Sequence, residues 1–363
     1  MKKAVLGIVV AAIVLVVAIA MRGQSDESKL AAAGAKADEK ARTAKASSET
    51  VLTIAPGMRR TTSAPTGPSR TSPLMAQFTA SHDYKAIYDR LKQLANPSPE
   101  EQYLMAHILE TCADITERPG GGKRNQRWRL GGEDSRRRFE GSLSPKVPNR
   151  QQRLDAFDKI NYDECAGLET LKITEKEMRA IYERAAAAGD PKARAAILRF
   201  QLQDQWRDAK GEYDFTRPMN ISDPQIDQWK GIMESGDPWA VVDAVQALSG
   251  FLSNRHLRDP NEVPIDFQAL YLASTLVSCD LGRDCGPNTR YLLQGCALNG
   301  ACDAADYRDY VFFYSAAPGS SQRIDEYRAH LLDAINRRDW SFFTFAPGPA
   351  PFIAGFQSSP RSP

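Results

Sequence analysis

The first 21 residues constrain this chain more than any other segment. Lys2 and Lys3 precede an uncharged apolar run of 18 residues, 4–21, which Arg22 closes. A helix of this length spans the hydrocarbon core of a bilayer, whereas the apolar core of a cleaved signal peptide has only about 7–15 residues. Because basic residues stay on the cytoplasmic side, we expect a signal anchor over residues 1–22 of a single-pass inner-membrane protein, with the bulk of the chain in the periplasm.

A second outcome is open at this segment. Ala18, Ile19 and Ala20 form a small-x-small cleavage site, and removal of the segment after Ala20 would leave a periplasmic or secreted protein. The chain after residue 22 is exported in both cases, and no later segment is apolar enough for a second crossing.

Composition divides the exported part into three. Residues 23–80 are rich in Ala, Ser, Thr, Pro, Lys and Glu, and Phe78 is the first aromatic residue of the chain. Such a segment buries too little apolar surface to offset its conformational entropy, so we expect a disordered linker. Residues 346–363 hold five prolines and are expected to form a disordered tail. One exported domain, 81–345, remains and is long enough for a sizeable core.

Helical periodicity dominates this domain. Apolar side chains recur at spacings of three and four residues, which is typical of one buried helix face. Four such stripes are Tyr84, Ile87, Tyr88, Leu91 and Leu94; Val241, Val245, Leu248 and Leu252; Tyr307, Tyr310, Val311 and Tyr314; and Tyr327, Leu331, Leu332 and Ile335. Since no stretch alternates with period two for long, the sequence predicts an all-α fold without an extensive sheet.

Two Gly-Asp-Pro turns join successive helical segments. Glycine adopts a left-handed conformation just past a helix end, aspartate caps the next helix, and proline fits the first turn of that helix. The turns are Gly189-Asp190-Pro191 and Gly236-Asp237-Pro238. The sequence therefore predicts one helical hairpin around residues 178–200 and another around 226–250.

The first hairpin resembles a Sel-like repeat, a relative of the tetratricopeptide repeat. The residues that carry the resemblance are Tyr182, Ala185, Ala186, Gly189, Asp190 and Ala193, with a weaker match at Gly236, Asp237 and Ala240. The resemblance implies a stack of helical hairpins, α-solenoid-like, that is used for protein contacts. An irregular helical bundle, in which the turns reflect capping chemistry alone, is the alternative.

Six cysteines in an exported chain indicate disulfides, because the close pairs are both Cys-x5-Cys and zinc sites use shorter spacings. The helix expected from about residue 288 to 297 is roughly 15 Å long. Pairing between the cysteines at its start and those at its end would exceed the reach of a disulfide. The expected pairs are therefore Cys279–Cys285 and Cys296–Cys302, with Cys112–Cys165 by elimination.

Residues 117–150 include a basic, glycine-rich stretch that we expect to be a long loop. Its candidate binding residues are Arg118, Lys123, Arg124, Arg127, Trp128 and Arg129. Cations around a tryptophan suit a polyanion or an acidic patch on a partner. Acidic residues at positions 117, 133, 134 and 140 dilute this charge, so a solvated loop is the alternative. Arg124 stands where a phosphate-binding loop needs Ser or Thr, which argues against nucleotide binding.

Other site classes find little support. The four histidines form no His-Glu-x-x-His pattern, and His107 shares a helix face with Glu110, where a surface hydrogen bond is expected. Asp303, Asp306 and Asp309 suit the start of a helix better than a calcium site. We assign no catalytic residue and expect no metal or cofactor. A net charge of +2 gives no general attraction to nucleic acid.

These observations predict a membrane-anchored periplasmic helical-repeat protein, held in the inner membrane by residues 4–21, that binds another protein of the bacterial cell envelope. One alternative is an envelope enzyme acting on peptidoglycan or polysaccharide. Glu234-Ser235 is similar to the start of the catalytic motif of soluble lytic transglycosylases, but the glycine-rich continuation is missing. The other alternative is a polyanion or surface-glycan binder that uses residues 118–138.

Overall fold

The computed structural model describes residues 70–113, 133–208, 211, 213–214, 217–248 and 253–348. The expected signal anchor and the expected linker up to residue 69 lie outside these residues. So do the candidate loop residues Arg118, Lys123, Arg124, Arg127, Trp128 and Arg129. In the part of the chain that is described, no helix combines the length and the apolar character needed to cross a bilayer.

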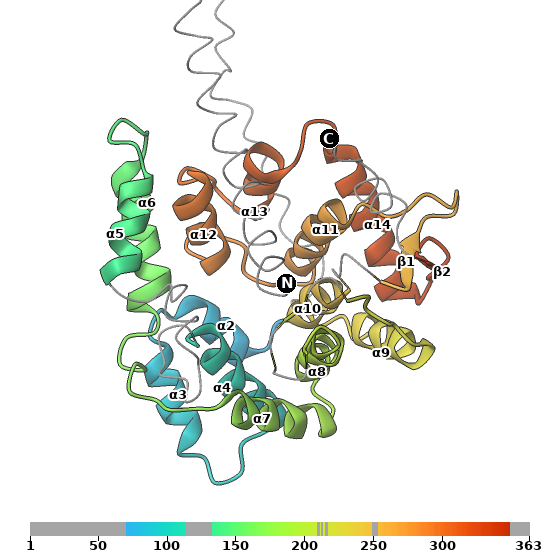
Figure 1. The fold of residues 1–363 in the computed structure, drawn as a ribbon, viewed down its shortest axis with the longest axis horizontal. Helices are drawn as coiled ribbons and strands as arrows, with labels where there is room; N and C mark the ends of the chain where they lie inside the picture. Colours follow the sequence, from blue (N-terminus) through green and yellow to red (C-terminus); the bar gives the residue numbers. More distant parts are fainter. Residues whose placement is uncertain are drawn as a thin grey trace, which may run out of the picture. The chain divides into compact units, whose positions relative to one another are not determined.

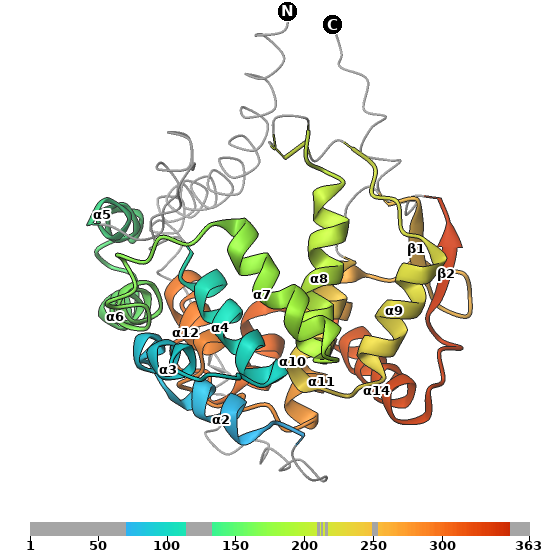
Figure 2. The same cartoon turned by 90° about the horizontal axis from the view of Figure 1, so that it is seen from below.

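The described residues are mostly helical, as the periodicity predicts (Figures 1 and 2). The α-helices are α2 (Pro73–Ala80), α3 (Tyr84–Lys92), α4 (Pro99–Thr111), α5 (Glu133–Ser142), α6 (Arg150–Asp158), α7 (Glu175–Ala187), α8 (Pro191–Asp204), α9 (Asp223–Met233), α10 (Pro238–Ala247), α11 (Phe267–Asp280), α12 (Arg290–Asn299), α13 (Tyr307–Tyr310) and α14 (Ser321–Arg337). Two π-helical turns, η3 (Lys159–Asp163) and η4 (Val311–Ser315), continue α6 and α13. An antiparallel pair joins β1 (Arg255–Arg258) to β2 (Thr344–Pro347), with Leu257 opposite Phe345.

Helices that are close in sequence pack on one another in a continuous row. Helix α4 packs on α7, α7 on α8, α8 on α10, α10 on α11 and α11 on α14 (Figure 2). One hydrophobic core holds Trp229, Val241 and Leu331, and a second holds Tyr103 and Tyr182. Because α8 and α10 contribute side chains to both cores, they form the wall that the two cores share.

Both Gly-Asp-Pro turns have the predicted geometry. Gly189 and Gly236 have φ of 96° and 62°, which is the left-handed region that glycine tolerates. The Asp190 side chain accepts a hydrogen bond from the amide of Ala193, and Asp237 accepts from the amides of Trp239 and Ala240. The hairpins α7–α8 and α9–α10 are thereby confirmed. Membership of a Sel-like repeat family stays a prediction.

In two of the predicted apolar stripes, the last residue is exposed and not buried. Leu94 is 40% exposed because α3 ends at Lys92, before the stripe does. Tyr314 is 39% exposed because it lies in η4, where the wider π-helical turn rotates it away from the face of Tyr307. Leu252 lies outside the described residues. The other members are buried or half-buried.

The folded part extends beyond the boundaries expected at 81 and 345. Helix α2 precedes residue 81, since Ser72 caps it and Met75 and Phe78 are buried. Strand β2 reaches Pro347, which pairs with Arg255. These few apolar contacts order a segment whose composition is that of a linker.

The segment expected to be a long loop, 117–150, contains a helix in its second half. Helix α5 begins at Glu133, and α6 begins at Arg150. Arg136 on α5 pairs with Glu140 and with Asp158 of α6, and Arg150 also pairs with Glu140. The loop interpretation is wrong here because the arginines find carboxylates one turn away and on the neighbouring helix.

Candidate functional site

The structure joins all six cysteines in the predicted pairs. The Cα separations are 5.7 Å for Cys112–Cys165, 5.8 Å for Cys279–Cys285 and 4.2 Å for Cys296–Cys302. The first links the end of α4 to the turn after η3, and the second closes the loop between α11 and α12. These two disulfides therefore fix segments that are distant in the sequence or irregular in structure.

A pocket lies beside the first two disulfides. It is formed by α2, the start of α3, the end of α4, the start of α10, the loop after α11 and the first turn of α12. The lining residues are Phe78, Thr79, Tyr84, His107, Thr111, Glu164, Trp239, Arg283, Asp284, Thr289, Arg290 and Tyr291. Thr111 and Glu164 directly precede Cys112 and Cys165 in the chain, while Arg283 and Asp284 lie inside the ring closed by Cys279–Cys285.

Arg283 is the most unusual residue of the pocket. It is only 9% exposed, and its guanidinium carbon lies 3.6 Å from the ring centroid of Trp239 and 4.5 Å from that of Tyr291. Among the described residues, no carboxylate or carbonyl oxygen accepts a hydrogen bond from this guanidinium. Burial of a cation without a counter-ion is costly, and two aromatic faces offset only part of that cost. The pocket thus contains one cation without a salt-bridge partner among the described residues, although the carboxylate of Asp243 attracts it at longer range.

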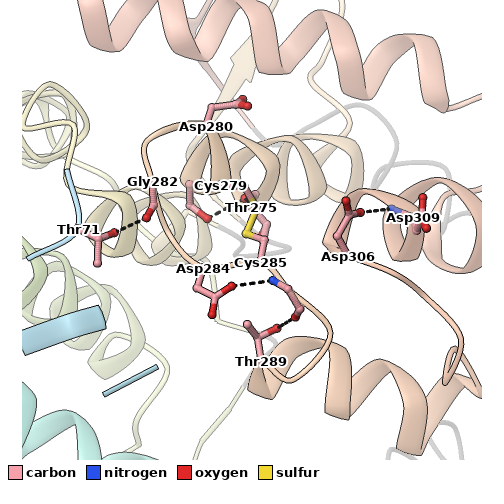
Figure 3. The surroundings of a disulfide bond; sticks show 12 residues. Thr71, Thr275, Cys279, Asp280, Gly282, Asp284, Cys285, Thr289, Asp306 and Asp309 are labelled. Carbon is pink, nitrogen blue, oxygen red and sulfur yellow. Dashed lines mark hydrogen bonds between the residues drawn. A yellow bond between two sulfur atoms is a disulfide. The ribbon is translucent and has the colours of Figure 1, made fainter. Parts of the chain in front are cut away.

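The loop that carries Arg283 is held from several sides (Figure 3). The amide of Arg70 donates to the carbonyl of Leu281, and the hydroxyl of Thr71 donates to the carbonyl of Gly282, both at 2.9 Å. Within the loop, the Asp284 carboxylate accepts from the amide of Gly286 at 2.8 Å. Together with the Cys279–Cys285 bond, these contacts fix the backbone from which the Arg283 side chain extends.

The second arginine of the pocket is already neutralised. Arg290 pairs with Glu164, a carboxylate that is 1% exposed, and donates to the carbonyl of Ile160 at 2.9 Å. Nδ1 of His82 lies 3.0 Å from the same carboxylate. Of the two arginines that line the pocket, only Arg283 therefore lacks an ion pair among the described residues.

Aromatic rings form much of the pocket surface. Trp239 is 7% exposed, and its indole N–H has no hydrogen-bond partner within the described residues. The His107 ring stacks on Tyr103 at 5.4 Å and meets the edge of Trp239 at 5.8 Å. The pKa of His107 is lowered to about 4, mainly by burial; Glu110 acts in the opposite direction, and Arg283 and two neighbouring arginines add to the lowering. His107 is therefore a neutral ring at pH 7.

Next to His107 lies a buried polar cluster. Glu110 accepts hydrogen bonds from Arg199 and from the hydroxyl of Tyr182, both at 2.8 Å. The hydrogen bond expected between His107 and Glu110 at the surface is wrong, because the half-buried Glu110 carboxylate is bound by Arg199 and Tyr182 instead. Asp243 faces the same cluster, and burial raises its pKa to about 6 although Arg199 acts in the opposite direction.

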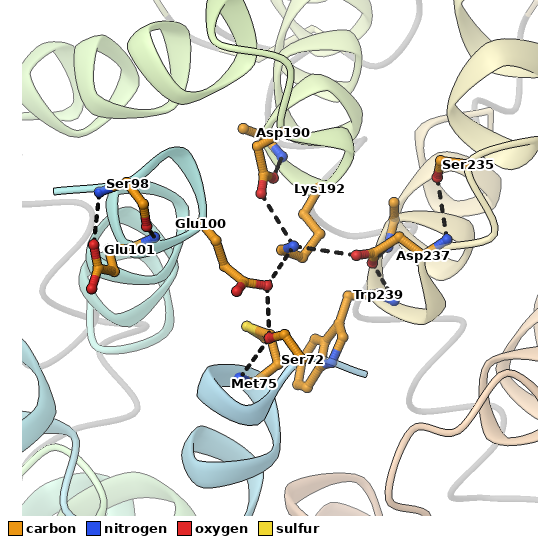
Figure 4. Close-up of polar contacts among 12 residues, drawn as sticks. Ser72, Met75, Ser98, Glu100, Glu101, Asp190, Lys192, Ser235, Asp237 and Trp239 are labelled. Carbon is orange, nitrogen blue, oxygen red and sulfur yellow. Dashed lines mark hydrogen bonds and ion pairs between the residues drawn. The ribbon is translucent and has the colours of Figure 1, made fainter. Parts of the chain in front are cut away.

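Lys192 links the two Gly-Asp-Pro turns (Figure 4). Its side chain is 3% exposed, and its Nζ lies 3.1 Å from Asp190 and 3.2 Å from Asp237, the two helix caps. A third carboxylate, Glu100 of α4, lies at 3.0 Å and also accepts from the hydroxyl of Ser72. Since Lys192 is fully paired, it ties α2, α4, α8 and α10 together and is not available to a ligand.

The other residues considered from the sequence have structural contacts. Glu234 ends α9 and accepts a hydrogen bond from the Trp340 indole at 2.8 Å, with Arg338 at 3.5 Å. Asp306 caps α13 as expected, by accepting from the amide of Asp309. None of these residues lines the pocket.

Sequence reasoning missed Arg283 and Trp239. A usable signal was present, because Lys192 and Trp239 hold the same position directly after each Gly-Asp-Pro. Their side chains point toward the α4 side of both hairpins (Figure 4). Arg283 stands between two cysteines that were expected to pair, which places it in a constrained loop.

No protein-family model matches the chain, and no curated protein or solved structure matches it. The function of the pocket is therefore argued from its own residues.

Proposed function

We propose that this chain is a membrane-anchored periplasmic protein whose helical domain binds another protein of the bacterial cell envelope, and that the pocket around Arg283 receives part of that partner. The apolar segment 4–21 supports the compartment. The Sel-like resemblance of the α7–α8 hairpin supports a role in protein contacts.

One observation carries the proposal: Arg283 is a nearly buried cation without an anionic partner among the described residues. A group in this state has already lost most of its water, so a ligand anion gains a strong contact at little further desolvation cost. The disulfide and the hydrogen bonds of the loop hold it in place, which lowers the entropy lost on binding.

Site-specific photo-crosslinking of the full-length protein in its native envelope tests this proposal. A benzophenone amino acid at Asn288, an exposed position next to the pocket residue Thr289, should give an adduct of one defined mass. The same probe at Val263, which is 54% exposed and does not line the pocket, is the matched control. The adduct should disappear when Arg283→Gln is combined with the probe at 288. Equal adducts at both positions, or an adduct that persists without Arg283, would contradict the proposal.

A further inference from the structure

We propose that the group bound by Arg283 is a carboxylate, and that an apolar side chain next to this carboxylate contacts the aromatic wall of the pocket. The inference rests on the proposed function, since it names the chemistry that the partner would present.

The charge of the pocket favours a monoanion. Arg283 is the one arginine of the pocket without an ion pair among the described residues, because Arg290 is paired with Glu164. Asp284 is an additional carboxylate on the pocket wall. A dianionic phosphate would bring a second negative charge close to these two acids without a second cation, and like charges at short range are unfavourable.

The arrangement of Arg283 favours a planar anion. A separation of 3.6 Å from Trp239 is that of stacked planes, and Tyr291 covers the guanidinium as well. The N–H donors of a guanidinium lie in its own plane, so contact with these rings leaves them available to a ligand. Two parallel N–H donors in one plane match the two oxygens of a carboxylate.

A second donor belongs to the ring that Arg283 contacts. The indole N–H of Trp239 is buried in the pocket wall and lacks a partner within the described residues. A buried donor without an acceptor costs free energy, which an oxygen of the ligand would recover. Trp239 thus provides a cover for Arg283 with its ring and a donor with its nitrogen.

The rest of the wall selects the neighbour of the carboxylate. Phe78 and Tyr84 stack at 4.8 Å and are almost completely buried, so the small part of each ring that lines the pocket is held rigidly. An aromatic or large aliphatic side chain next to the carboxylate would bury its surface there.

Calorimetric titration of the full-length protein in detergent tests the inference with four probes. They are acetyl-Ala-Phe with a free C-terminal carboxylate, the same peptide as its C-terminal amide, acetyl-Glu-Phe amide, and inorganic phosphate. We expect a carboxylate peptide to bind about 10- to 100-fold more tightly than acetyl-Ala-Phe amide, which is the range for a hydrogen bond to a charged group. The first and third probes separate a chain-terminal carboxylate from a side-chain one.

Two variants complete the test. Arg283→Gln should remove the preference for the carboxylate, whereas Arg323→Gln, an exposed arginine outside the pocket, should leave it unchanged. Equal binding of the amide, tighter binding of phosphate, a preference that survives Arg283→Gln, or no binding of either carboxylate peptide at millimolar concentration would overturn the inference. Carboxylate binding without the crosslink described above would sustain this inference and remove the protein partner. A crosslink without carboxylate binding would support the protein partner and overturn this inference.

Discussion

The guanidinium carbon of Arg283 lies 3.6 Å from the ring centroid of Trp239, while Arg290, the other arginine of the pocket, is paired with Glu164. This pair joins two parts of the fold that have separate structural origins. The N-terminal cap of α10 determines the position of Trp239, and the disulfide-closed loop after α11 determines that of Arg283.

Arg283 should matter little for folding. Arg283→Gln loses aromatic stacking worth about 0.5–2 kcal/mol, but it also removes a buried charge without a counter-ion. We therefore expect the free energy of unfolding to change by no more than about 1 kcal/mol, as measured by urea denaturation. Arg199→Gln is the matched control, since it leaves Glu110 without its cation and should cost about 3 kcal/mol. If the two variants were equally destabilised, Arg283 would be a structural residue.

The two turn glycines should respond differently to alanine. Both have positive φ, so Gly189→Ala and Gly236→Ala share a strain of about 1–2 kcal/mol. A Cβ at Gly189 meets nothing within 4 Å, whereas one at Gly236 collides with the end of the Arg70 side chain. Gly236→Ala should then lose the Arg70–Asn336 hydrogen bond and be less stable by about a further 1 kcal/mol. In an Arg70→Ala background the difference between the two variants should vanish in thermal melts, and a difference of unchanged size would contradict the contact.

The Cys279–Cys285 bond should support binding more than stability. This bond and Cys296–Cys302 each span a sequence separation of 6, so removing either pair by serine should cost about 2 kcal/mol in the chain-entropy model. Only the first closes the loop of Arg283. The Cys279→Ser/Cys285→Ser variant should therefore bind acetyl-Ala-Phe at least about tenfold more weakly, while Cys296→Ser/Cys302→Ser binds like the parent. Equal losses in both variants would show that the loop does not preorganise the site.

Two buried groups should give opposite pH dependences of stability. The pKa of His107 is lowered to about 4, mainly by burial, so its contribution is complete above pH 6.5 and is lost as the pH falls through 4. The pKa of Asp243 is raised to about 6, also mainly by burial, so its contribution is present below about pH 4 and is lost as the pH rises through 6.

Each group changes the free energy of unfolding by at most about 3 kcal/mol, and the two contributions nearly cancel between pH 4 and 6.5. We expect Asp243→Asn to leave a stability that rises with pH over this range, and His107→Gln to leave one that falls. Urea denaturation at a series of pH values measures both slopes. Two variants with slopes of the same sign would show that one of the pKa directions is wrong.

Those parts of the fold that are determined by residues close together in the chain could be predicted from the sequence. Gly189 and Gly236 were identified because the left-handed turn, the aspartate cap and the proline are all local chemistry. The pairing of Cys279 with Cys285 followed from the length of one helix. Helix α5 was missed because its stability depends on Arg136 contacting Asp158, a residue on another helix.

The pocket could not be predicted for a related reason. It combines Phe78, His107, Trp239 and Arg283, which are far apart in the chain and ordinary in their local patterns. What distinguishes Arg283 is the absence of a salt bridge to any carboxylate of the described residues, and only the tertiary structure shows which carboxylates are already paired. The repeated position of Lys192 and Trp239 after the two turns was the one local indication that both face the same region.

The most direct test of the account is a nuclear magnetic resonance titration of the full-length protein in detergent with acetyl-Ala-Phe, observing the side-chain N–H resonances of Arg283 and Trp239. We predict that both resonances shift together, with one dissociation constant, and that acetyl-Ala-Phe amide leaves them in place. If neither resonance moves with the free-acid peptide, or if both move equally with the amide, Arg283 and Trp239 do not form a carboxylate site.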